Sequence, residues 1–175
     1  MGRDKAFIEI DGIPLWQRQL RILQELAPAE IFIAGPPRSE WENVGGVIVP
    51  DAQEECGPLG GIVAALRLSR TDLLLALAVD LPHMSANYLR VLVGRSADGE
   101  GVIPWRDRYE PLAAVYPKRA LELAEQLLAS GEYSLQSFAD TCVREELVLK
   151  QLVSAADAPL FLNMNTPADL LEAVQ

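Results

Sequence analysis

A glycine and two cations lie within the first five residues of the chain, directly before an apolar run. These residues are Gly2, Arg3 and Lys5. Positive side chains on a flexible backbone are typical of loops that hold the phosphates of a nucleotide triphosphate. The spacing therefore predicts a phosphate-binding loop. The alternative interpretation is a solvated pair of charges near the chain end.

Carboxylates follow two strand-like segments farther along the chain. Asp51 closes the segment 47–49, and Asp80 follows the apolar segment 72–79. A carboxylate just beyond a buried strand, near a phosphate site, is a natural Mg²⁺ ligand, because Mg²⁺ prefers one or two carboxylates plus phosphate oxygens and water. Each acid taken alone is equally consistent with an ordinary turn residue.

A glycine-rich segment comes shortly after Asp51 and opens a helix-like segment. Its sequence is Gly57-Pro58-Leu59-Gly60-Gly61. Glycines allow a backbone to approach a ligand closely, although a tight loop with close helix packing requires the same residues.

Strand-like and helix-like segments alternate and must bring these residues together. Strands are predicted at 6–10, 31–33, 47–49, 72–79, 102–105, 112–116 and 146–150, and helices at 14–26, 60–68, 86–93 and 119–128, with a last helix from Thr166. Repeated strand–helix units predict an α/β fold, a three-layer sandwich with a mostly parallel sheet. The segment 72–79 is apolar from Leu73 onward, which predicts a central parallel strand covered on both faces. Ligands of such sheets bind at the carboxyl ends of the strands.

Composition narrows the classes of protein. At 175 residues we expect a single domain spanning 1–175. The net charge of −10 argues against nucleic acid or an anionic membrane as partner. Cys56 and Cys142 show no metal-ligand spacing and are predicted to be reduced thiols. The longest apolar stretch, Leu73 to Val79, is too short to span a bilayer, so we expect a cytoplasmic location.

Taken together and in this order, the motifs resemble the molybdenum cofactor guanylyltransferases of the MobA type, within the Rossmann-like nucleotidyltransferases. The resemblance covers essentially the whole chain. It runs through MGRDKAFIEIDGIPLWQ, PDAQEECGPLGGIVAAL, AVDLPHM, EPLAAVY and FLNMNTPADL. The GPLGG and NMNTPADL segments are the distinctive ones, whereas an Asp-x-Pro after an apolar strand is shared by many nucleotidyltransferases.

The resemblance implies a role for each motif. Lys5 would neutralise the nucleotide phosphates, with Arg3 and the Gly2 backbone nearby. Asp51 would contact the nucleoside portion of GTP, and Asp80 would hold Mg²⁺. The backbone of Gly57, Pro58 and Gly60 would form a wall beside the base or the pterin. Asn165 would be a second ligand on the metal side, although an Asn there is also consistent with a helix cap.

One part of the family's early signature does not appear in the sequence. The signature is a run like LAGGxSxRMGxDK, and the chain carries MGRDK. The LAGGxSxR part of the signature would supply the first strand, which is central in this fold, and most of the phosphate-binding loop. A sheet without this strand would expose unpaired edges. We expect a start codon assigned too late, with an in-frame LAGGxSxR-like run encoded directly upstream of Met1. A stop codon there would contradict this expectation.

The implied reaction is attack by the phosphate of molybdopterin, or of its molybdenum form, on the α-phosphorus of GTP, with release of pyrophosphate. Mg²⁺ is the implied cofactor, and Lys5 and Asp80 are the implied catalytic residues. The implied partners are GTP, molybdopterin or the molybdenum cofactor, and, transiently, molybdoenzymes or their chaperones.

Two alternatives stay open. One is a cytidylyltransferase for the same cofactor, although the segment NMNTPAD favours guanine over the DxDTPxD typical of those enzymes. The other is a nucleotide-binding protein that has lost catalysis, which the incomplete phosphate loop would favour.

Overall fold

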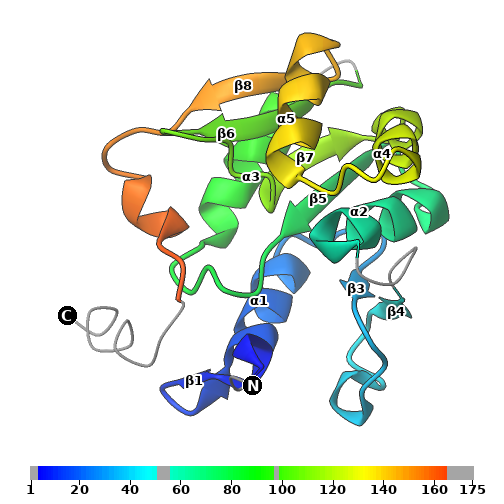
Figure 1. The fold of residues 1–175 in the computed structure, drawn as a ribbon. Coiled ribbons are helices and arrows are strands. Elements are labelled where there is room, and N and C mark those ends of the chain that lie inside the picture. Colours follow the sequence, from blue (N-terminus) through cyan, green and yellow to red (C-terminus); the bar gives the residue numbers. More distant parts are fainter. Residues whose placement is uncertain (1–3, 51–55, 97–98, 165–175) are drawn as a thin grey trace.

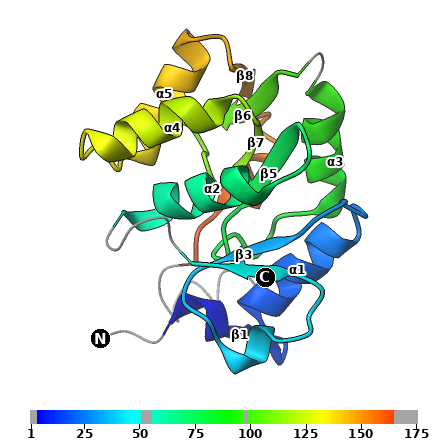
Figure 2. The same cartoon turned by 90° about the vertical axis from the view of Figure 1, so that its right-hand side faces the viewer.

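Helices cover both faces of the strands in the computed structural model, which describes residues 4–50, 56–96 and 99–164 (Figure 1). Figure 2 shows α2, α4 and α5 on one side of the strands and α3 and α1 on the other. This arrangement confirms the predicted α/β class with three layers.

The first apolar run is less extended than the sequence predicts. Lys5–Phe7 form a short 3-10 helix, η1, because the side chain of Asp4 accepts a hydrogen bond from the Ala6 amide at 3.1 Å. The predicted strand over 6–10 is therefore wrong in its first half. Only Glu9–Ile10 are a strand, β1, paired antiparallel with β2.

Most of the following elements agree with predicted segments, whereas β2 and η2 were not predicted. The elements are β2 (Ile13–Pro14), α1 (Leu15–Gln24), β3 (Phe32–Ala34), η2 (Ser39–Trp41), β4 (Val47–Val49), α2 (Gly57–Leu68) and β5 (Leu73–Leu77). Helix α2 begins three residues earlier than expected, at Gly57, so the glycine-rich segment is the first turn of the helix and not a loop before it.

The described part of the second half contains one α-helix, α5, and one 3-10 helix, η3, that the sequence analysis did not predict. The elements are α3 (Ala86–Arg95), β6 (Gly101–Trp105), β7 (Ala113–Pro117), α4 (Ala120–Ala129), α5 (Leu135–Arg144), β8 (Val148–Leu152) and η3 (Ala158–Phe161). Ser134 caps the missed helix α5 by accepting from the Ser137 amide at 3.2 Å. Gly131 follows α4 at a φ of 78° and closes it, as predicted. The predicted last helix lies outside the described residues.

The strands divide between separate sheets. Strands β3 and β4 pair in parallel, and a four-stranded sheet has the order β5-β7-β6-β8. Strand β7 runs antiparallel to both β5 and β6, while β6 and β8 are parallel, so the four-stranded sheet is mixed rather than mostly parallel. The prediction of β5 as a central parallel strand is wrong for this arrangement, since β5 is the end strand of its sheet and its neighbour is antiparallel.

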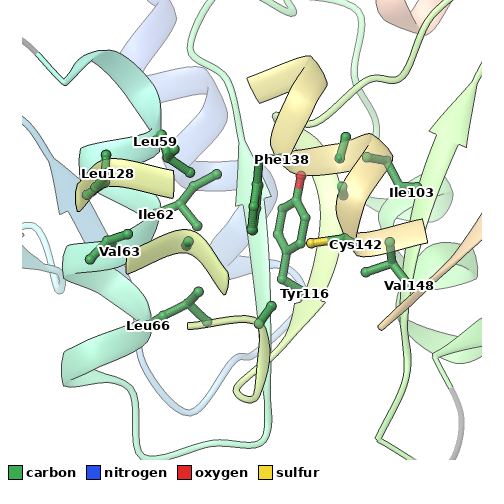
Figure 3. Packing of buried hydrophobic residues seen from close by; sticks show 14 of the residues in the cluster. Leu59, Ile62, Val63, Leu66, Ile103, Tyr116, Leu128, Phe138, Cys142 and Val148 are labelled. Atoms are coloured by element: carbon green, nitrogen blue, oxygen red, sulfur yellow. The ribbon is translucent and has the colours of Figure 1, made fainter. Parts of the chain in front are cut away.

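The larger core lies between the four-stranded sheet and the helices α2, α4 and α5. Tyr116 from β7 packs on Phe138 from α5 with ring centroids 5.1 Å apart, and Cys142 lies beside them (Figure 3). The opposite face of the same sheet packs against α3 and η3, where Tyr88 meets Phe161 edge to face at 5.3 Å. Apolar side chains of β5 contribute to both clusters, which confirms that this strand is covered on both faces.

Strands β3 and β5 point the same way, and their ends are tied together. At the amino ends, Glu30 accepts hydrogen bonds from the Arg70 amide and guanidinium at 2.8 and 3.0 Å. At the carboxyl ends, the adjacent residues Asp4 and Lys5 form ion pairs with Arg38 and Asp80. Between the two strands lies a cavity of about 940 Å³, which α1 and α2 also line; we call it the inter-sheet groove.

Candidate active site

Asp80 and Lys5 form an ion pair at the carboxyl end of β5. The Lys5 Nζ donates to Asp80 Oδ2 at 3.3 Å. The side chain of Asp80 is 21% exposed and that of Lys5 is 43% exposed, so solvent and a ligand can reach both. The structure therefore brings together the two residues that the sequence analysis singled out as catalytic, although they lie 75 positions apart.

The C-terminal motif is anchored to the same place. The amide of Met164 donates to the backbone oxygen of Asp80 at 3.0 Å, and the Met164 side chain is buried against Ile10 and Leu15. Asn163 lines a small pocket together with Asp80. The segment that leads to Asn165 is thus held beside Asp80, while Asn165 itself lies outside the described residues.

The amino end of α2 opens onto the same region. Gly57 and Pro58 line the inter-sheet groove, as do Asp4 and Asp80. Gly57 has a φ of 58°, a conformation that glycine adopts without strain. The first turn of a helix presents backbone N–H groups and the positive end of the helix dipole, which favour an anion. Gly60 is buried within α2, and its expected place in the backbone wall stays a prediction.

Sequence reasoning missed one cation of this region, Arg38. It pairs with Asp4, and its guanidinium lies 4.9 Å from the Phe7 ring centroid and 5.6 Å from that of Trp41. Arg38 occupies the turn after β3, where the sequence shows only a Gly-Pro-Pro breaker followed by a charge. Nothing local distinguishes that charge from a solvated one, since the contact to Asp4 spans 34 positions.

A second pocket of about 200 Å³ lies on the other side of Asp80 and is lined by Arg108, Tyr109, Gln136 and Asn163 among others. The neighbouring Arg106 is engaged elsewhere, because its guanidinium donates two hydrogen bonds to Glu110 Oε1 at 2.9 and 3.2 Å. Burial raises the pKa of the Tyr109 hydroxyl above its ordinary value, so this hydroxyl stays protonated at neutral pH.

The donor set at Asp80 fits a magnesium ion bound together with a nucleotide. Across the described ranges, no three His, Cys, Asp or Glu side chains are grouped as a metal site. A single carboxylate completed by phosphate oxygens and water is a common arrangement for Mg²⁺. Asp80 therefore suits a metal that arrives with a nucleotide.

Several predicted site residues lie outside the described residues, namely Gly2, Arg3, Asp51 and Asn165. Cys56 and Cys142 are both buried, and Cys142 is a free thiol. In the part of the chain that the structure describes, no helix is long and apolar enough to cross a membrane.

A mixed α/β fold with a cation, a carboxylate and a helix amino terminus at one strand end suits the binding of a nucleotide. A model of the MobA-like NTP transferase domain matches residues 1–147. The chain belongs to this family.

Curated relatives of similar sequence come from several bacteria. A probable molybdenum cofactor guanylyltransferase of Opitutus terrae is 34% identical over 173 residues, covering 97% of this chain and 86% of the relative. The molybdenum cofactor guanylyltransferase of Pseudomonas putida strain GB-1 is 28% identical, covering 95% of this chain and 86% of the relative.

Solved structures share the fold at lower identity. The molybdopterin-guanine dinucleotide biosynthesis protein A of Archaeoglobus fulgidus is 23% identical, with a TM-score of 0.76 over 98% of this chain and 89% of that protein. The 2-C-methyl-D-erythritol 4-phosphate cytidylyltransferase of Thermus thermophilus is 16% identical, with a TM-score of 0.73 over 97% of this chain and 91% of that protein. These likenesses confirm the nucleotidyltransferase fold of Rossmann-like type.

Proposed function

We propose that the protein transfers GMP from GTP to the phosphate of molybdopterin, or of its molybdenum form, and releases pyrophosphate. The observation that carries the proposal is the Lys5–Asp80 pair, 3.3 Å apart, in front of the amino terminus of α2. The family and the names of the curated relatives support the choice of substrates.

In the proposed reaction, an oxygen of the acceptor phosphate forms a bond to the α-phosphorus of GTP. The bond from that phosphorus to the oxygen bridging the β-phosphate breaks, and pyrophosphate leaves with the electron pair. The acceptor phosphate is already a nucleophile, so the protein needs no nucleophilic side chain. It has to align the two substrates and neutralise the charge of their phosphates.

Each described site residue has a place in this scheme. Asp80 would hold Mg²⁺, which supplies charge neutralisation at the reacting phosphates. Lys5 would turn from Asp80 to the nucleotide phosphates, since the arriving cation replaces it as the partner of the carboxylate. The N–H groups at the start of α2 would face the same anion.

The residues outside the described ranges keep their expected roles as part of the proposal. Gly2 and Arg3 would complete the phosphate contacts, Asp51 would bind the nucleoside and Asn165 would be the second ligand on the metal side. Arg108 lines the small pocket beside Asp80 and would meet the phosphate of the acceptor, since Arg106 is committed to Glu110.

The rival substrate is CTP, because a cytidylyltransferase shares the fold. Calorimetric titration of the protein with GTP and Mg²⁺, and with CTP as the control, distinguishes the two. Binding of GTP but not of CTP supports the proposal. Binding of CTP but not of GTP would mean that the protein transfers CMP instead of GMP. Binding of either nucleotide without pyrophosphate release in the presence of molybdopterin would indicate a nucleotide-binding protein without catalysis.

Product delivery to molybdoenzymes or their chaperones, a cytoplasmic location and a single domain over residues 1–175 stay predictions.

A further inference from the structure

Arg108 lies in the turn that joins β6 to β7 and lines the second pocket beside Asp80. Its side chain is exposed, and its guanidinium has no hydrogen-bond or ion-pair partner among the described residues. The other arginine of the turn, Arg106, is bound to Glu110. Of these two cations, Arg108 is therefore the one that an anion in the pocket can engage.

The peptide unit that links Arg108 to Tyr109 is hydrogen-bonded at both of its polar groups. Its C=O, which belongs to Arg108, accepts from the Arg106 amide at 3.0 Å. Its N–H, which belongs to Tyr109, donates to Gln136 Oε1 at 3.2 Å. Because a peptide unit is planar, the two bonds fix its orientation and thereby the ψ angle of Arg108.

The next peptide unit is held in the same way. The C=O of Tyr109 accepts from Gln136 Nε2 at 2.9 Å, and the N–H of Glu110 donates to the backbone oxygen of Pro104 at 2.9 Å. The amide of Gln136 thus exchanges two hydrogen bonds with the backbone of Tyr109, which is the pattern that a paired residue makes in an antiparallel ladder. Each of the two peptide units beside Tyr109 receives one of these bonds.

Gln136 belongs to an element that is distant in sequence and well anchored. It is the second residue of α5, 27 positions from Tyr109, and it also lines the second pocket. Phe138 and Cys142 bury the helix in the larger core. Gln136 itself is exposed, so water can replace its bonds and they contribute little to the free energy of folding. Their main consequence is the local geometry of the turn.

We propose that Gln136 is a positioning residue for the acceptor and that it acts through Arg108. By holding both peptide units of Tyr109, Gln136 fixes the backbone that carries Arg108 beside the second pocket. The guanidinium then meets a phosphate monoester next to Asp80 without prior ordering of the turn, which lowers the entropic cost of binding. This inference rests on the proposed function, which assigns the acceptor phosphate to Arg108.

Three variants of the full chain test the relationship between the two residues. Gln136→Met keeps the length of the side chain and removes both bonds to Tyr109. Arg108→Ala removes the guanidinium, and the third variant combines the two substitutions. Gln126→Met is the matched control, because Gln126 is exposed on α4 and donates to Glu122 of the same helix at 3.5 Å.

The probe is a pterin that carries a phosphate monoester, titrated without nucleotide and followed by its fluorescence. We expect Arg108→Ala to raise the Kd of the probe by about tenfold, the loss of one charge-assisted contact. Gln136→Met should raise it by about fivefold, because the turn then has to be ordered on binding. In the Arg108→Ala background, Gln136→Met should have no further effect, since no guanidinium is left to position.

Two further readouts separate positioning from a general loss of structure. In steady-state kinetics, Gln136→Met should raise KM for molybdopterin and leave KM for GTP unchanged. Amide hydrogen exchange at Tyr109 should become faster in Gln136→Met. Unchanged exchange at Tyr109 would overturn the proposal, because Gln136 would then not hold the turn.

The double variant gives the sharpest contradiction. If Gln136→Met raises the Kd of the probe by the same factor with and without Arg108, Gln136 acts independently and the proposal is overturned. An unchanged Kd in Gln136→Met, an equal change in Gln126→Met, or no binding of the probe to the unaltered protein would also overturn it. The proposed function is decided separately by selectivity between GTP and CTP. A protein that selects CTP can still show the coupling, and a protein that selects GTP can lack it.

Discussion

Lys5 Nζ lies 3.3 Å from Oδ2 of Asp80, so the cation expected to bind phosphate is paired with the carboxylate expected to bind metal. Each neutralises the other before substrate arrives. A metal–nucleotide complex carries both complementary charges and would separate the pair into two contacts, Asp80 to metal and Lys5 to phosphate. Substrate binding then replaces the Lys5–Asp80 ion pair by two charge-assisted contacts. Because each side chain keeps a partner of opposite charge, the free-energy cost of removing it from water is reduced.

Replacing Asp80 tests the metal role. We expect Asp80→Asn to lower the rate of pyrophosphate release by about 100-fold or more, because several kcal/mol of charge stabilisation are lost. Asp72→Asn is the matched control, since Asp72 is exposed and precedes the other end of the same strand. Unchanged activity in Asp80→Asn at saturating Mg²⁺ would contradict the role of Asp80.

Replacing Lys5 tests the phosphate role. Lys5→Ala is expected to raise the Kd for GTP by about tenfold, the loss of one charge-assisted contact, and to reduce the salt dependence of binding. Titration calorimetry at two salt concentrations measures both effects. Lys150→Ala is the control, because the Lys150 ammonium on β8 lies 4.5 Å from the ring centroid of Trp105 on β6. An equal loss of GTP affinity in both variants would indicate that the overall charge of the protein, and not a specific contact with Lys5, affects binding.

The partly buried ion pair of Arg106 and Glu110 predicts a change in the free energy of unfolding when it is broken. Arg106→Ala leaves the carboxylate of Glu110, which is 9% exposed, without its guanidinium partner. We expect the free energy of unfolding to fall by about 2 kcal/mol, which is less than for a fully buried pair because the Arg106 side chain is 30% exposed. Urea denaturation measures the change. Arg144→Ala, which breaks an exposed pair with Asp140, should cost less than about 0.5 kcal/mol. Comparable losses in the two variants would contradict the distinction.

Cys142 predicts alkaline destabilisation. Burial raises the pKa of its thiol from 9.0 to about 12. The folded state thus holds the proton more tightly than the unfolded state, so this contribution to stability is complete below pH 9 and is lost as the pH rises toward 12. Burial raises the pKa of Tyr116 well above 10.0, in the same direction.

Unfolding free energies measured by denaturant between pH 8 and 11.5 should fall, and Cys142→Ala should make the fall shallower. The thiolate absorbance of Cys142, followed in a Cys56→Ala background, gives the pKa directly. A thiolate that forms near pH 9 in the folded protein would refute the assignment to burial.

Local patterns in the sequence predicted most elements but not their pairing. The apolar periodicity of α1 and the breakers around β3 and β4 located them within a few residues. The position of β5 was predicted from its apolar run, yet its place at the end of a sheet depends on which strands are adjacent, and that information is not local. Helix α5 was missed because its polar residues hide a narrow buried stripe of Phe138, Ala139 and Cys142.

Two residues of the candidate site could be named from the sequence, although their roles stay predictions. Lys5 and Asp80 were named from their neighbours in sequence, and the structure places them in contact. Arg38 could not be found in this way, because its position depends on Asp4 and on two aromatic rings from different segments.

Helix α2 contacts β3 and β4 of one sheet and β5 of the other, and its amino end faces the Asp80 region. Lys118 fixes its far end by donating to backbone oxygens of Leu66 and Ser69. The helix therefore packs against strands of both sheets. A substitution that alters the packing of either sheet against α2 is thus expected to shift the Gly57 amide and to change the affinity of this end of the helix for an anion.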